Sequence, residues 1–151
     1  MLAIYRQQQR LDELFNRVKD LPDPELQAHW CRYLCVLVCG FLENSVELSL
    51  AEYTKRRADE SVSNFVEAKL GGFQNPRMGA ILDLFGCFSP EWRASLNSAT
   101  QGQLSDSVNS IVGNRHKIAH GDSVSLSLSS LKAYYKDSLR VVEIISSICG
   151  N

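Results

Sequence analysis

The stretch from Leu26 to Leu42 restricts the possible folds of this chain more than any other segment. Its apolar residues are Leu26, Trp30, Tyr33, Leu34, Leu37, Val38, Phe41 and Leu42. On a helix they cover much of the circumference, which predicts a helix buried on several sides at the centre of the packing. The apolar run from Tyr33 to Leu42 reaches only about half of the length needed to cross a bilayer, so no membrane anchor is expected.

Three of the five cysteines follow one face of this predicted helix. Cys31, Cys35 and Cys39 recur every four residues, so their side chains point the same way and cannot easily form disulfides. They are predicted to be small core residues, and the same is expected of Cys87 and Cys149, which have apolar neighbours. The C-x3-C-x3-C spacing also differs from the short-loop spacing of zinc sites, so no metal is expected there.

Helix start and stop signals divide the first half of the chain. An apolar stripe from Leu11 to Leu21 predicts an amphipathic helix that ends at Pro22. The sequence Asp23-Pro24-Glu25 then supplies an N-cap, a first-turn proline and a first-turn acid for the long helix. Farther on, Ser49-x-x-Glu52 has the pattern of a capping box, which predicts a third helix that starts there and runs to Gly71.

The second half is predicted to contain two short connecting helices followed by two longer ones. Their starts and ends are marked by Asn75-Pro76, Ser89-Pro90, Gly121 and Ser127. With 151 residues, 44% of them apolar and 22% charged, the chain has the composition of one soluble, helix-prone domain. We therefore predict a single all-α domain over residues 1–151, folded as an antiparallel helical bundle.

Net charge gives no direct sign of a partner. Sixteen Lys and Arg residues oppose 17 Asp and Glu residues, which leaves a net charge of −1. Any site for an anion such as RNA must therefore be local. The first residues, MLAIYRQQQRLDELF, lack the apolar region and cleavage site of a secretory signal, which predicts a cytoplasmic protein.

One predicted helix interrupts its own apolar pattern. Its apolar residues recur at helical spacing and are Leu104, Val108, Ile111, Val112, Ile118 and Ala119. Arg115 occupies a position where the pattern predicts another apolar residue. It lies within the sequence S-I-V-G-N-R-H-K-I-A-H-G-D from Ser110 to Asp122. An unpaired guanidinium in a core is strongly unfavourable, so Arg115 must meet a carboxylate, a partner subunit or an anionic ligand.

Two histidines follow this arginine closely. His116 and His120 are four residues apart and share a helix face next to Arg115. His120 lies in the last turn, where the carbonyl end of the helix favours a protonated imidazole. Such a cluster suits RNA cleavage without a metal, with His120 as acid or base and Arg115 as stabiliser of the transition-state charge. Positions five apart lie about 140° around a helix, so Arg115 and His120 meet only through the arginine's reach or from opposing subunits.

This motif resembles the HEPN superfamily of small helical domains, whose ribonuclease members carry R-x(4–6)-H with a polar residue directly after the arginine. Arg115, His116 and His120 match these three positions, and Gly121 follows as in the common form of the motif. Other segments are similar to the RiboL-PSP type of HEPN domain over most of the chain. They are His29–Glu43, Asn75-Pro76 and the sequence S-L-S-S-L-K-A-Y-Y that starts at Ser127.

The resemblance implies an all-α bundle that forms a homodimer, in which two R-x4-H motifs line one cleft. It also implies a metal-independent endoribonuclease without a cofactor, which leaves 2′,3′-cyclic phosphate and 5′-hydroxyl ends. Such enzymes are typical of toxin–antitoxin, abortive-infection and other antiphage systems, so an antitoxin or defence protein is an expected partner. HEPN toxins silenced by adenylylation carry a tyrosine at the position of Asp122, so that silencing is not expected here.

Several other interpretations stay open for the same residues. Arg115 could be a structural residue paired with a core acid such as Glu43, or Glu43 could support the site from behind. His116 and Asn114 are candidate supporting residues, and Asn114 could bind a phosphate or a partner chain. The two histidines have the spacing of a metal pair, but no third ligand is evident beyond Asp122. A non-catalytic HEPN module that binds a nucleotide or a partner protein is the alternative to a ribonuclease.

Overall fold

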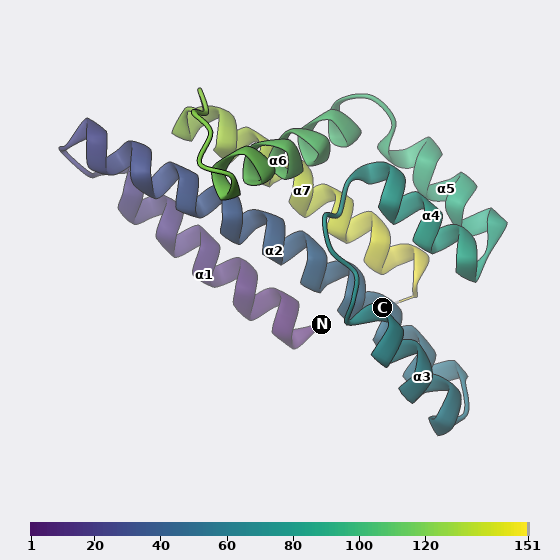
Figure 1. The fold of residues 1–151 in the computed structure, drawn as a ribbon. Helices are drawn as coiled ribbons and strands as arrows, with labels where there is room; N and C mark the ends of the chain where they lie inside the picture. The colour runs from purple at the N-terminus through teal and green to yellow at the C-terminus, as the bar shows by residue number, and fades with distance from the viewer. Residues whose placement is uncertain (151) are drawn as a thin grey trace.

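The apolar segment predicted to be central lies within α2, Pro24–Arg57, a helix of 34 residues. In the computed structural model, which describes residues 1–150, this helix packs against α1, α3, α6 and α7 (Figure 1). The other helices are α1 Leu2–Lys19, α3 Glu60–Leu70, α4 Met78–Phe88, α5 Pro90–Thr100, α6 Gln103–Ala119 and α7 Leu128–Ile148. The described residues contain no strand, so the predicted all-α bundle is confirmed.

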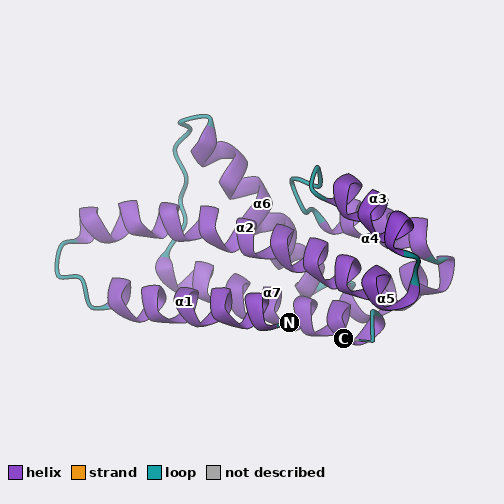
Figure 2. Cartoon of the chain, turned by 90° about the horizontal axis from the view of Figure 1, so that it is seen from below, coloured by secondary structure: helices purple, strands orange, loops and turns teal. Residues whose placement is uncertain are grey.

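Helices α1, α2 and α7 run side by side along the length of the molecule, as Figures 1 and 2 show. Helix α6 packs on α2 and α7. Helices α4 and α5 pack against each other, and α5 also contacts α7. Leu34, Val38, Phe41 and Leu42 of α2 are fully buried between these layers, whereas Leu26 and Tyr33, also predicted to be buried, are exposed. By length and composition α2 could cross a membrane, but 61% of its most apolar 18-residue window is buried inside the bundle.

Three of the predicted helix starts are confirmed by side-chain caps. Asp23 accepts hydrogen bonds from the N–H groups of Glu25 and Leu26 at 2.9 and 3.3 Å. The hydroxyl oxygens of Ser89 and Ser127 accept the N–H groups at the starts of α5 and α7 in the same way. These caps satisfy backbone donors that have no partner inside a helix, and so they determine where each helix begins.

The predicted capping box at Ser49 is wrong. Helix α2 continues through Ser49 and Glu52 to Arg57, and Ser49 is buried in the middle of it. The buried series Val46, Leu50 and Thr54 keeps the four-residue spacing across the box, and Tyr53 packs edge-on against Trp92 of α5. Burial of this continued face outweighs a local cap, which would need extended backbone. Helix α3 instead begins after Asp59, whose side chain accepts the Ser61 N–H.

The cap-plus-proline start predicted at Asn75-Pro76 is also wrong. Helix α4 begins at Met78, and the residue before it, Arg77, makes no side-chain cap. The Met78 N–H donates to Asn109 Oδ1 of α6 at 2.9 Å, so the cap comes from another helix. Asn75 itself has a φ of 55°, a left-handed conformation that an N-cap residue does not adopt.

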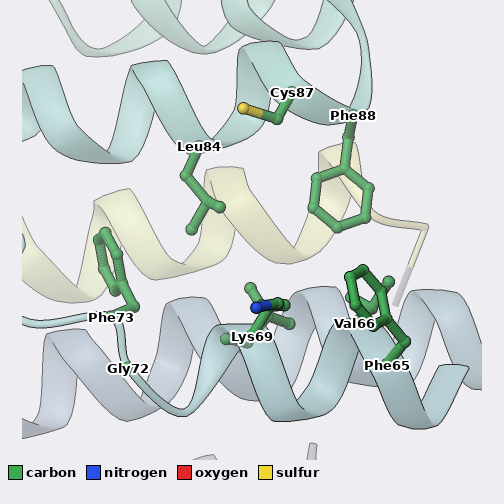
Figure 3. Close-up of a pocket in the computed structure, with 9 residues that line it drawn as sticks. Phe65, Val66, Lys69, Gly72, Phe73, Leu84, Cys87 and Phe88 are labelled. Atoms are coloured by element: carbon green, nitrogen blue, oxygen red, sulfur yellow. The ribbon is translucent and has the colours of Figure 1, made fainter.

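Four of the five cysteines are buried, as predicted, and the fifth is not. Cys31, Cys35, Cys39 and Cys149 are core residues without disulfides, whereas Cys87 is exposed. Cys87 lines an apolar pocket of about 430 Å³ between α3 and α4 (Figure 3). Its apolar sequence neighbours suggested burial, but α4 turns this position toward the open space beside α3.

The buried thiols predict a loss of stability at alkaline pH. Burial raises the pKa of the Cys35 and Cys149 thiols to about 12 and that of Cys39 to about 11, above the ordinary value of 9.0. Above pH 9 the unfolded chain therefore releases thiol protons that the folded chain retains. The free energy of unfolding is unaffected by these groups below that pH and falls between pH 9 and 11, by at most about 1.4 kcal/mol per pH unit for each thiol.

Chemical denaturation at pH 8 and pH 10.5 measures this loss. The Cys35→Ala variant lacks one of the three thiols, so its stability should change less between the two pH values than that of the wild type. An equal pH dependence in both proteins would show that the Cys35 thiol ionises as freely in the fold as in the unfolded chain.

Candidate active site

Arg115 lies near the end of α6, on the apolar face predicted from the spacing of its residues. Val108, Ile111 and Val112 of this face are buried, and Arg115 is half-buried beyond them. Its Nη1 donates a hydrogen bond of 3.2 Å to Asn75 Oδ1 in the loop between α3 and α4. The acceptor is a neutral amide oxygen, so this contact holds the guanidinium without cancelling its charge.

Glu43 is near Arg115 but does not form the ion pair that the sequence left open as an alternative. Among the described residues, no carboxylate lies within the 4.0 Å of a salt bridge to Arg115. Glu43 Oε1 instead accepts the backbone N–H of Asn75 at 2.9 Å. Two hydrogen bonds therefore link Glu43 to Arg115 through Asn75, and we call this arrangement the relay. It takes the place of a direct ion pair between Glu43 and Arg115.

Cys39 lies beside this relay on the core side. Burial and, to a smaller extent, the charge of Glu43 raise the pKa of the Cys39 thiol, and the charge of Arg115 lowers it, which together give a pKa of about 11. Both charged groups are therefore close enough to act on the thiol. The thiol remains protonated near neutral pH, so Cys39 is not a nucleophile of this site.

The two histidines of the motif meet at the carbonyl end of α6. The ring centroids of His116 and His120 are 4.4 Å apart, which confirms that they share a face, and both side chains are exposed. Gly121 has a φ of 78°, and the N–H of Asp122 donates to the Lys117 carbonyl at 2.9 Å. This glycine-dependent ending stops the helix at Ala119, with His120 as its C-cap and Gly121 directly after it, as the sequence predicted.

Asn114 makes a hydrogen bond within its own helix. Its Nδ2 donates to the Ser110 carbonyl of the same helix at 2.8 Å, so its amide is engaged along α6. A metal site at the histidine pair would need a third ligand. The described residues contain no group of three side chains that could hold a metal ion together. The residues gathered at this end of α6 are therefore the arginine, the two histidines and the exposed Lys117.

Sequence reasoning missed two residues of this site, Asn75 and Arg77. The Asn75-Pro76 pair predicts a helix cap, and asparagine's tolerance of a left-handed backbone is the one signal in the sequence that agrees with the observed turn. Arg77 is exposed and reaches α6, where its Nη2 would lie 3.9 Å from a Cβ added to Gly113. A second guanidinium thus approaches the helix that carries Arg115, and no spacing rule connects these two positions.

A comparison with known families agrees with this helical arrangement. The model of the RiboL-PSP-HEPN family matches residues 3–151, which is nearly the whole chain. No curated protein and no solved structure matches the chain. The resemblance to HEPN domains is confirmed by this match, and the chain belongs to the RiboL-PSP-HEPN family.

Proposed function

We propose that the protein is a metal-independent endoribonuclease that acts as a homodimer in the cytoplasm. Membership in a HEPN family supports an RNA-related or nuclease role in general terms. The observation that carries the specific proposal is the state of Arg115, which is half-buried and held by a neutral amide instead of a carboxylate. A guanidinium kept in place with its charge intact is suited to bind a phosphate.

The proposed reaction is an attack of the RNA 2′-oxygen on the adjacent phosphorus. The new bond from phosphorus to the 2′-oxygen forms as the bond to the 5′-oxygen breaks, which leaves a 2′,3′-cyclic phosphate and a 5′-hydroxyl. A neutral imidazole accepts the 2′-hydroxyl proton, and an imidazolium donates a proton to the leaving 5′-oxygen. Arg115 donates hydrogen bonds to the non-bridging oxygens, whose negative charge increases in the transition state.

His120 is the proposed acid or base, and a second copy of the chain supplies the complementary group. His116, Lys117 and His120 are exposed on the surface of one chain. Two copies that face each other at this surface would place two arginines and two histidine pairs around one phosphate. Their combined local charge would attract RNA although the whole chain carries a net charge of −1.

We place this activity in a toxin–antitoxin or antiphage system, because small HEPN ribonucleases are typical of such systems. Lys117 and the exposed histidines would then be accessible to an inhibitory partner protein when RNA is absent. Asn114 and His116 are proposed as supporting residues, with His116 packed against the His120 ring and Asn114 along the helix behind it.

The role of the 2′-hydroxyl gives a direct test. We expect an RNA oligonucleotide to be cut, and the same oligonucleotide with a single 2′-deoxy residue at the cleaved position to resist cutting there. Denaturing gel electrophoresis with end-group analysis measures both results. Cleavage of the 2′-deoxy substrate would contradict the mechanism, and RNA binding without cleavage of either substrate would support the non-catalytic HEPN module instead.

A further inference from the structure

Asn75 has an unusual backbone conformation beside the proposed active site. Among the described residues it is the one non-glycine residue with a positive φ, at 55°. Asparagine tolerates this left-handed conformation better than most residues, and it is still uncommon outside glycine. Such residues cluster at functional sites, where the conformation serves to direct a side chain.

Three hydrogen bonds define the position of Asn75. Its N–H donates to Glu43 Oε1 at 2.9 Å, and its carbonyl oxygen accepts the Arg77 N–H at 2.7 Å. Its Oδ1 accepts Arg115 Nη1 at 3.2 Å. The backbone of Asn75 is therefore held by Glu43 from α2, while its side chain is left to hold Arg115 of α6.

The loop around Asn75 is anchored on both sides. On one side, the Phe73 side chain lies between α3 and α4 with Leu84, as Figure 3 shows, and the Phe73 N–H donates to the Leu70 carbonyl at 2.8 Å. On the other side, Pro76 is buried and Asn109 of α6 caps the Met78 N–H. Both ends of the loop are thus held against the bundle, and the exposed Asn75 lies between them with its amide on Arg115.

We propose that Asn75 is a positioning residue, which holds the Arg115 guanidinium in place for the RNA phosphate while leaving its charge uncancelled. This inference rests on the proposed ribonuclease function. An arginine carries five N–H donors, so one bond to an amide oxygen leaves the others available for phosphate oxygens. A carboxylate at this position would hold the guanidinium equally well but would compete with the phosphate for its charge.

Two substitutions of Asn75 test its two effects separately. One tests whether Asn75 holds the Arg115 guanidinium in place, and the other tests whether it leaves the guanidinium charge uncancelled. Asn75→Gly retains the left-handed backbone and removes only the amide acceptor. We expect its kcat for RNA cleavage to fall about 10-fold to 100-fold, with KM little changed, because Arg115 is bound to RNA but misplaced. Asn75→Asp retains both the acceptor and the backbone preference, and we expect mainly a rise in KM, because the carboxylate opposes the phosphate.

Gln74→Gly provides the matched control. Gln74 is exposed in the same loop, and this change adds the same flexibility without touching the relay. We expect Gln74→Gly to cleave RNA like the wild type, and all three variants to unfold within a few degrees of it. Wild-type kcat in Asn75→Gly, or an equal loss of kcat in Gln74→Gly, would overturn the inference.

A readout without RNA separates this inference from the proposed function. In ¹⁵N NMR spectra of the whole protein, the guanidinium signals of Arg115 should change in Asn75→Gly, whereas those of Arg140 on α7 should not. If the wild type cleaves no RNA, the proposed function fails, and the Arg115 signals still decide whether Asn75 holds this side chain. Unchanged Arg115 signals in Asn75→Gly would overturn the positioning role whether or not the protein is a ribonuclease.

Discussion

The Arg115→Ala variant is expected to cleave RNA about 100-fold to 1,000-fold more slowly than the wild type, which is the usual effect of removing one hydrogen-bond donor to a transition-state oxyanion. Arg115 is half-buried, and its hydrogen bond to Asn75 holds the guanidinium where we propose that the RNA phosphate binds. Single-turnover cleavage with saturating protein measures the loss. Because the Arg115→Ala substitution would also weaken RNA binding, the cleavage rate with saturating protein is the quantity that reports on the transition state.

Arg140→Ala is the control for a general loss of positive charge. Arg140 lies on α7 and pairs with Glu143 at 2.8 Å, with most of its side chain in solvent. The same substitution there should leave cleavage within about twofold of the wild type, since exposed pairs of this kind contribute little. An Arg115→Ala protein that folds and cleaves at the wild-type rate would exclude Arg115 from the active site.

The Phe41→Ala variant is expected to lose about 3–5 kcal/mol of stability, as usual when a fully buried aromatic side chain is deleted. Phe41 is completely buried in α2, and its ring lies 6.3 Å from that of Tyr135 on α7. Its loss would leave a cavity where α2 and α7 meet. Equilibrium unfolding in urea, followed by circular dichroism, gives the change in the free energy of unfolding.

Phe65→Ala makes the same chemical change on the surface. Phe65 is 62% exposed on α3, where its ring lies 5.5 Å from the Lys69 ammonium. We expect this variant to lose no more than about 1 kcal/mol, the size of an exposed cation–π contact. Equal losses in the two variants would contradict the assignment of α2 as the central helix of the bundle.

The central helix was predictable because its signal is repeated over many residues. Apolar side chains around most of the circumference from Leu26 to Leu42 require burial on several sides, and within this predicted set only Leu26 and Tyr33 stay exposed. The Ser49 signal failed because it is local. A four-residue capping pattern is weaker than the burial of Val46 and Leu50 on either side of it, so the helix continued.

The motif itself was predictable, but the surroundings of its arginine were not. Helical spacing alone places His116 beside His120, and Gly121 marks the helix end that follows. The partner of Arg115 comes from a loop 40 positions away in the sequence. Its amide is directed by a left-handed turn that depends on Glu43 and on packing, which no residue pattern in the sequence expresses.

Cleavage of RNA by the purified wild-type protein in the presence of EDTA tests the central claim most directly. We predict cleavage at an unchanged rate when divalent ions are removed, with 2′,3′-cyclic phosphate and 5′-hydroxyl ends, and a loss of these products in Arg115→Ala. A folded wild-type protein that needs a divalent ion to cut RNA, or that leaves 5′-phosphate ends, would contradict the account.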